Sequence, residues 1–227
     1  MAPPRPAADG RLTSRPSPQV QNPALPAGVH VLGPGDGPEL LLAVPPGEAG
    51  PRPLLVFFHG AGGTAQQSLA AVGEQAARRG ILLLAPTSVT TTWDLIAAGA
   101  PGRDVAVLDA ALAEVSQRSA ISRVGVAGFS DGASYALSLG LANGNLFDAV
   151  LAFSPGFVAP PGREGRPRVW VAHGGHDRVL PVERCGRKVS GALAEAGYDV
   201  TYEEFDGGHV VTPGLVTAAL DWWLGAA

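Results

Sequence analysis

The chain has 227 residues, of which 46% are hydrophobic and 16% are charged, and its formal net charge is -4. This length suits one α/β domain, and no apolar run reaches the roughly 18 to 20 residues that a membrane span requires. The weak negative charge, without any basic block, argues against a nucleic-acid or membrane-surface partner. The single cysteine, Cys185, excludes an internal disulfide and a multi-cysteine metal site.

Residues 1–28 form a tail that is rich in Pro, Ala and Arg. The tail lacks the apolar stretch of about 7 to 15 residues that a secretory signal carries, so we expect a cytoplasmic location. We expect the tail to be poorly ordered or draped over the surface. Removal of residues 1–25 should then leave the thermal stability nearly unchanged.

The rest of the chain, 29–227, is predicted to form one α/β domain. Two short apolar runs, 29–33 and 39–44, are separated by the turn-rich sequence PGDGP and predict a β-hairpin. Further strands are expected over 53–60, 81–86, 123–129, 148–154, 167–174 and 199–207, and helices over 65–80, 104–119, 131–143, 182–197 and 212–225. Strands that are apolar throughout and alternate with amphipathic helices predict a mostly parallel sheet of about eight strands, covered by helices on both faces.

Polar and glycine-rich segments follow several of the predicted strands. In a parallel sheet, ligands bind beyond the carboxyl ends of the strands, so these segments define the expected site. They are His59-Gly60-Ala61-Gly62-Gly63, Ser130, His173-Gly174-Gly175-His176-Asp177 and Gly207-Gly208-His209.

Ser130 lies in the sequence Gly128-Phe129-Ser130-Asp131-Gly132, which fits the pattern G-x-S-x-G. In this pattern a strand ends in a sharp turn whose flanking positions have no room for a Cβ, and the turn presents the serine hydroxyl. The pattern by itself is weak in a chain with 31 glycines. Its position between a predicted strand and a predicted helix is the structural context that the pattern requires.

A serine hydroxyl is a poor nucleophile unless a base removes its proton, and the base needs an acid to orient it. Asp177 and His209 follow Ser130 in the chain, the first after the seventh predicted strand and the second after the eighth. Ser130, Asp177 and His209 are therefore the candidate nucleophile, acid and base.

The chain resembles the α/β-hydrolase superfamily, and within it the compact serine esterases of the phospholipase/carboxylesterase and polyhydroxyalkanoate-depolymerase-like groups. The resemblance covers residues from about 29 to the end and rests on HGAGG (59–63), GFSDGAS (128–134), HGGHDRVLP (173–181) and GGH (207–209). It implies Ser130 as nucleophile, His209 as general base and Asp177 as its orienting acid. Two positions differ from the family pattern: relatives often have glutamine at Asp131, and some have proline before the histidine.

An oxyanion hole is expected from the backbone N–H of Asp131, at the N-terminus of a helix, and from a second N–H in the HGAGG segment. The resemblance implies Ala61 as this second donor, with Gly62 as the alternative. Each fixed donor is worth about 3 to 4 kcal/mol in the transition state.

Candidates for the substrate pocket are Gly62, Trp93, Phe157, Val179 and Leu180, which lie in loops next to the expected site. Between the sixth and seventh predicted strands, residues 155–166 are too short and too rich in Pro and Gly for a large cap domain. An open site of this kind favours small, soluble esters.

Other residues offer alternative roles. His173 and His176 could compete as the base but are interpreted as loop-bonding histidines, and together with Asp177 they make a weak candidate for a metal site. Asp206 is the alternative acid. Cys185 is expected to be buried and inert, because it falls inside a predicted helix.

The sequence therefore predicts a serine carboxylic-ester hydrolase that needs no metal and no other cofactor and acts on small or short-to-medium-chain esters. Its expected partner is a small-molecule ester, with no nucleic acid, and its oligomeric state is left open. The rival interpretations are a thioesterase, a lysophospholipase or a polyester depolymerase with the same triad, and a non-catalytic binding module of the same fold.

Overall fold

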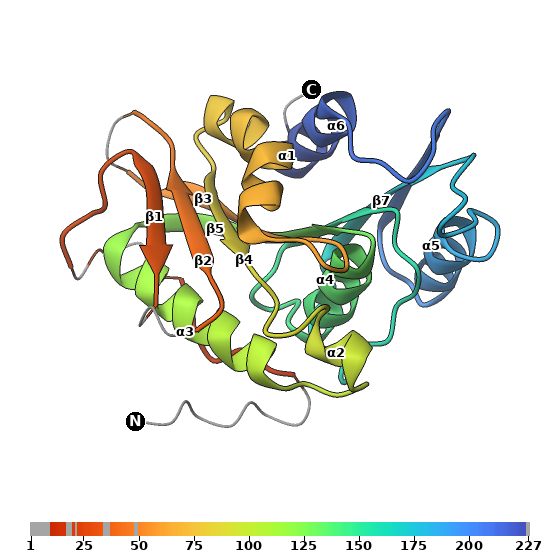
Figure 1. Cartoon of the computed structure of the whole chain (residues 1–227), viewed down its shortest axis with the longest axis horizontal. Coiled ribbons are helices and arrows are strands. Elements are labelled where there is room, and N and C mark those ends of the chain that lie inside the picture. Colours follow the sequence, from red (N-terminus) through yellow and green to blue (C-terminus); the bar gives the residue numbers. More distant parts are fainter. Residues whose placement is uncertain (1–9, 17–19, 21, 34–36, 48–49, 226–227) are drawn as a thin grey trace.

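The computed structural model describes residues 10–16, 20, 22–33, 37–47 and 50–225. Its centre is an eight-stranded sheet in the order β1-β2-β4-β3-β5-β6-β7-β8 (Figure 1). The strands are β1 (Gly28–Leu32), β2 (Leu40–Val44), β3 (Arg52–Phe58), β4 (Leu82–Pro86), β5 (Ile121–Phe129), β6 (Ala149–Phe153), β7 (Arg168–Gly174) and β8 (Val200–Phe205). Strands β1, β2 and β4 pair antiparallel and the remaining neighbours pair parallel, which confirms the predicted hairpin and the mostly parallel sheet.

The helices are α1 (Ala65–Arg78), α2 (Asp94–Ala97), α3 (Arg103–Arg118), α4 (Asp131–Ala142), α5 (Gly186–Glu195) and α6 (Pro213–Leu224). The short helix α2 was not predicted. The helix predicted over 182–197 begins later, at Gly186, because the N–H groups of Arg184 and Cys185 both donate to the Pro181 carbonyl in a tight turn. No helix in the described part of the chain is both long and apolar enough to cross a membrane.

Helices cover both faces of the sheet, with α1 and α6 on one side and α3, α4 and α5 on the other (Figure 1). Successive side chains of a strand point to opposite faces. In β3, Leu55 and Phe57 therefore pack with α1 and α6, whereas Leu54, Val56 and Phe58 pack with the helices on the opposite face. Both faces of the sheet are apolar, which explains why the strands read as continuous apolar runs. The segment between β6 and β7 contains no helix, as expected for a domain without a large cap.

Part of the predicted tail packs against the domain. Leu12 is only 2% exposed and joins the core on the α3 and α4 side. Its N–H donates to the Asn143 side chain at 2.8 Å, and Asn143 in turn donates to the Gly10 carbonyl at 3.0 Å. The expectation of a poorly ordered or surface-draped tail was wrong for this segment, because Leu12 buries its side chain and Asn143 satisfies the backbone around it. Residues 1–9, 17–19 and 21 of the predicted tail lie outside the described residues.

Candidate active site

The turn between β5 and α4 presents Ser130 at the carboxyl edge of the sheet. Ser130 has φ 57° and ψ −119°, a backbone conformation that non-glycine residues rarely adopt and that costs about 1 to 3 kcal/mol. A Cβ on Gly128 would stand 2.2 Å from the Gly132 carbonyl oxygen, and a Cβ on Gly132 would stand 2.2 Å from the Phe58 carbonyl oxygen. Only glycine fits at either flanking position, which is the steric reason for the G-x-S-x-G spacing.

His209 lies between Ser130 and Asp177. Its Nε2 is 2.9 Å from the Ser130 Oγ, and its Nδ1 is 2.6 Å from the Asp177 Oδ2. Its ring also packs against the ring of Phe129, with 4.6 Å between centroids. With the carboxylate as the acceptor at Nδ1, the neutral imidazole donates its proton there and leaves Nε2 free to accept the serine proton.

The loop after β7 holds the Asp177 carboxylate in position. The N–H groups of Val179 and Leu180 donate to Oδ1 at 2.9 and 2.8 Å. Burial raises the pKa of the Asp177 carboxyl, but these two hydrogen bonds and the one from His209 outweigh burial, so the pKa lies below its ordinary value. The carboxylate is therefore ionised at neutral pH, as an orienting acceptor must be.

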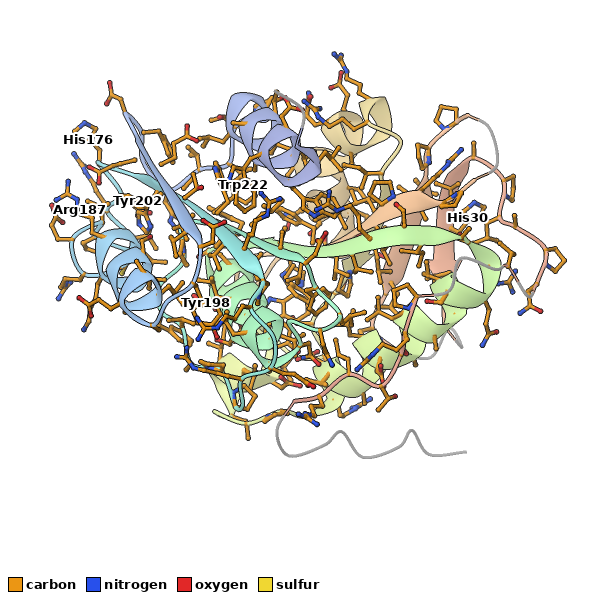
Figure 2. All side chains as sticks on the ribbon, turned by 180° about the vertical axis from the view of Figure 1, so that it is seen from behind. His30, His176, Arg187, Tyr198, Tyr202 and Trp222 are labelled. Atoms are coloured by element: carbon orange, nitrogen blue, oxygen red, sulfur yellow. The ribbon has the colours of Figure 1, made fainter. Side chains whose placement is uncertain are left out.

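His173, near the end of β7, and His176, in the loop after it, differ in environment. His173 is fully buried, and its Nε2–H donates to the Leu180 carbonyl at 2.7 Å while lying 3.3 Å from Asp177 Oδ2. His176 is 77% exposed and lies 3.1 Å from Asp206, which is 95% exposed. Figure 2 shows His176 at the outer end of the molecule, near Arg187 and Tyr202. His173 therefore bonds the loop that carries Asp177, and Asp206 pairs with a surface histidine.

No group of three or more His, Cys, Asp or Glu side chains that could hold a metal ion occurs among the residues that the structure describes. Cys185 is 8% exposed, and burial raises the pKa of its thiol, which disfavours the reactive thiolate.

Ala61, in the segment after β3, lines the same cavity as His209. The N–H of Gly62 already donates to the Thr91 carbonyl at 2.7 Å, so it is engaged elsewhere. Asp131 is the first residue of α4, and the first N–H groups of a helix have no partner within the helix. Of the two alternatives in this segment, the geometry favours Ala61 over Gly62.

His59 is buried and holds its own segment in shape. Its Nε2 accepts from the Ser88 N–H at 3.0 Å, so its Nδ1–H is the donor to the Gly60 carbonyl at 2.6 Å. Burial lowers the pKa of His59, and the Gly60 carbonyl only partly opposes this, which keeps the ring neutral.

Trp93 was predicted as a pocket residue, and this prediction was wrong. Trp93 is 1% exposed, stacks on Tyr135 at 5.0 Å between ring centroids and donates its indole Nε1–H to the His59 carbonyl at 2.9 Å. A buried indole N–H requires an acceptor, and the strand end supplies one. The neighbouring Thr92 hydroxyl donates to the Asp131 carboxylate at 2.7 Å, so one loop contacts both halves of the expected oxyanion hole.

Two carboxylates, of the buried Asp104 and the partly buried Asp94, anchor this loop, and the sequence analysis did not identify them. Asp104 accepts from the N–H groups of Val89 and Asp94 at 2.7 and 2.8 Å, and Asp94 accepts from Gly102 at 2.8 Å. Burial, reinforced by the neighbouring Asp94 charge, raises the pKa of Asp104 to about 6 despite the hydrogen bond from Val89. The only sequence signal was Asp104 at the start of a predicted helix, which also fits a favourable interaction with the helix dipole.

A cavity of about 400 Å³ opens beside His209 and Ala61, with Phe57 and Phe129 among its lining residues. The predicted pocket residues Gly62, Phe157, Val179 and Leu180 do not belong to its lining. Phe157 and Val179 are instead 39% and 65% exposed.

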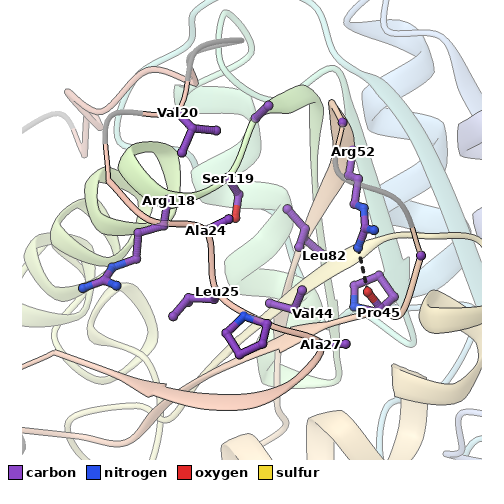
Figure 3. Close-up of a pocket in the computed structure, with 14 residues that line it drawn as sticks. Val20, Ala24, Leu25, Ala27, Val44, Pro45, Arg52, Leu82, Arg118 and Ser119 are labelled. Carbon is purple, nitrogen blue, oxygen red and sulfur yellow. Dashed lines mark hydrogen bonds between the residues drawn. The ribbon is translucent and has the colours of Figure 1, made fainter.

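A second cavity of about 220 Å³ lies at the opposite edge of the sheet (Figure 3). Its lining includes Arg52 and Leu82, at the amino ends of parallel strands, and Leu25 from the N-terminal segment. Arg52 donates to the Pro45 carbonyl there at 2.7 Å. This cavity is therefore remote from Ser130.

No protein-family model matches the sequence, and no curated protein matches it. Solved structures do match. The structure of esterase PE8 is 23% identical with a TM-score of 0.63, covering 84% of this chain and 99% of that one. Est1E from Butyrivibrio proteoclasticus is 16% identical with a TM-score of 0.65, covering 88% and 98%. An S-formylglutathione hydrolase from Staphylococcus aureus is 14% identical with a TM-score of 0.70, covering 90% and 98%. The chain has the α/β-hydrolase fold, as the sequence predicted.

Proposed function

We propose that this protein is a serine carboxylic-ester hydrolase that acts on small or short-to-medium-chain esters. The observation that carries the proposal is the position of His209, with one ring nitrogen 2.9 Å from the Ser130 hydroxyl and the other 2.6 Å from the Asp177 carboxylate. The likeness to solved esterases supports the same conclusion at the level of fold.

In the proposed reaction, the Ser130 Oγ attacks the ester carbonyl while its proton moves to His209 Nε2. The N–H groups of Ala61 and Asp131 stabilise the negative charge that develops on the carbonyl oxygen. His209 then gives the proton to the departing alcohol, which leaves an acyl group on Ser130. A water molecule, deprotonated by His209, attacks this acyl-enzyme and releases the acid.

The test is hydrolysis of p-nitrophenyl esters from acetate to palmitate by the wild type and by Ser130→Ala. We expect activity in the wild type, greatest at short to medium acyl chains, and its loss in the variant by a factor of about 10⁴ or more. Ser190→Ala is a suitable control, because Ser190 is a buried serine of α5 whose hydroxyl has no hydrogen-bond partner.

A folded wild-type protein that hydrolyses none of these esters would contradict the proposal. That result would favour one of the alternatives: cleavage of thioesters, lysophospholipids or polyesters by the same triad, or a non-catalytic binding module of this fold.

A further inference from the structure

The cavity beside His209 is lined by residues from several elements of the fold. Its lining includes Ala71 on α1, Val211 in the loop before α6, and Phe57 and Phe129 from the central strands β3 and β5. Phe57 is buried to 2% exposure and packs in the core with α1 and α6. The cavity is therefore a largely apolar recess set into one face of the sheet, next to the imidazole.

The chemistry of ester cleavage determines which part of a substrate can enter this recess. The proton that His209 takes from Ser130 is delivered from Nε2 to the alkoxyl oxygen, so the alcohol part of the ester must leave beside the His209 ring. His209 and Ala61 both line the recess, whereas Phe157 and Leu180 do not. Given the proposed function, on which this inference rests, we propose that the recess binds the alcohol part of the ester and makes the enzyme selective for small, uncharged aromatic or branched alcohols.

The lining explains this choice of alcohol. The described residues that line the recess include no Asp, Glu, Lys or Arg, so nothing there compensates the loss of hydration of a charged alcohol. A volume of about 400 Å³ lies near the lower end of ligand pockets, which hold about 300 to 1,000 Å³. The Phe57 and Phe129 rings offer apolar and aromatic contact to a group of benzyl size. The phosphate-bearing alcohol part of a lysophospholipid does not suit this lining.

The acyl part occupies a different environment. With the alcohol at the recess, the acyl group extends away from it, toward the first turn of α4. There, Ser134 accepts from the N–H groups of Gly156 and Phe157 at 2.9 and 3.4 Å. Phe157 and Val179 are substantially exposed on that side, so a longer acyl chain meets open surface instead of a closed wall. The enzyme should therefore discriminate more strongly among alcohols than among acyl chains.

The experiment fills the recess and compares two substrate series. Ala71→Phe places a ring at the exposed mouth of the recess. Ala70→Phe makes the same change at the preceding residue of α1, which is also exposed and is not part of the lining. One series is methyl, butyl and benzyl acetate, and the other is the methyl esters from acetate to octanoate. Methyl and benzyl alcohol are leaving groups of similar basicity, so their ratio of kcat/KM reports binding.

We expect the wild type and Ala70→Phe to prefer benzyl acetate to methyl acetate by about tenfold or more, and Ala71→Phe to lose this preference. All three proteins should have the same profile along the methyl-ester series. An Ala71→Phe variant that alters the acyl series and keeps the benzyl preference would overturn the proposal and assign the recess to the acyl chain. A wild type that has no benzyl preference would overturn it as well. A wild type that hydrolyses no ester in either series would refute the proposed function itself.

Discussion

The indole of Trp93 donates its Nε1–H to the backbone carbonyl oxygen of His59 at 2.9 Å, in the core directly behind the segment that carries Ala61. The same loop accepts the Gly62 N–H at Thr91 and donates the Thr92 hydroxyl to Asp131. A single loop thus fixes both segments that are expected to stabilise an oxyanion, although it supplies neither of the two proposed donors. Trp93 is a positioning residue in this arrangement.

Trp93→Phe should lower kcat by about tenfold with little change in KM. The smaller ring keeps the aromatic packing but leaves the buried His59 carbonyl without its donor, at a cost of about 1 to 3 kcal/mol, and loosens the segment next to the reacting carbonyl. Steady-state kinetics on one p-nitrophenyl ester measures this. Trp222→Phe is the control, because Trp222 bonds to Thr201 on the far strand β8. Equal kinetics in the two variants would exclude the positioning role.

Asp177→Asn should leave the fold intact and lower kcat by a factor of about 10⁴. An amide in place of the carboxylate no longer fixes His209 with its Nδ1 protonated, so the ring cannot accept the serine proton at Nε2. Circular dichroism checks the fold, and ester hydrolysis gives the rate. Asp206→Asn is the comparison. Asp206 is exposed and pairs with His176, so near-normal turnover is expected in that variant. The reverse pattern would transfer the acid role to Asp206.

Leu12→Ala should destabilise the protein by about 2 to 5 kcal/mol, which a fall in Tm measures. The side chain is 2% exposed in the core, so truncation leaves a cavity. Val20→Ala, in the same N-terminal region but 45% exposed, should change the stability by less than about 0.5 kcal/mol. Equal Tm values for Leu12→Ala and the wild type would restore the sequence-based expectation that the tail can be removed without cost.

The pH dependence of stability should carry a contribution from Asp104. Its pKa is about 6 in the folded protein, against an ordinary value of 3.8, so between these pH values the folded state binds more protons than the unfolded state. The contribution of Asp104 to the free energy of unfolding therefore falls as pH rises from about 4 to about 6. Carboxyls with lowered pKa values, such as Glu204 at about 2, act in the opposite sense and at lower pH.

Asp104→Asn should flatten this decrease, as measured by urea unfolding at several pH values between 4 and 7. Asp109→Asn is a comparison on the same helix, α3, whose carboxylate accepts at the protein surface from Thr13. An unchanged slope in Asp104→Asn would show that another group causes the decrease.

Local sequence patterns predicted much of the fold. Strands that are apolar throughout, alternating with amphipathic helices, are typical of a parallel sheet with helices on both faces. This pattern predicted the sheet of eight strands. The requirement for glycine at 128 is likewise local, because the Gly132 carbonyl of the same turn leaves no room for a Cβ, whereas glycine at 132 is required by the carbonyl of Phe58 on β3. The positions of Asp177 and His209 after predicted strands also indicated that they lie near Ser130, since the carboxyl ends of parallel strands share one edge of the sheet.

The remaining features depend on contacts between residues far apart in the chain. Trp93 could have faced the substrate or the core, and the His59 carbonyl, 34 residues away, provides the acceptor that favours the core. In the sequence, Leu12 belongs to a proline-rich tail. In the structure, its N–H donates to the side chain of Asn143, 131 residues away, and its side chain is buried in the core. Buried hydrogen-bonding groups need partners, and here the partners come from distant parts of the chain. The burial of Trp93 and Leu12 was therefore determined by the tertiary structure and not by local sequence pattern.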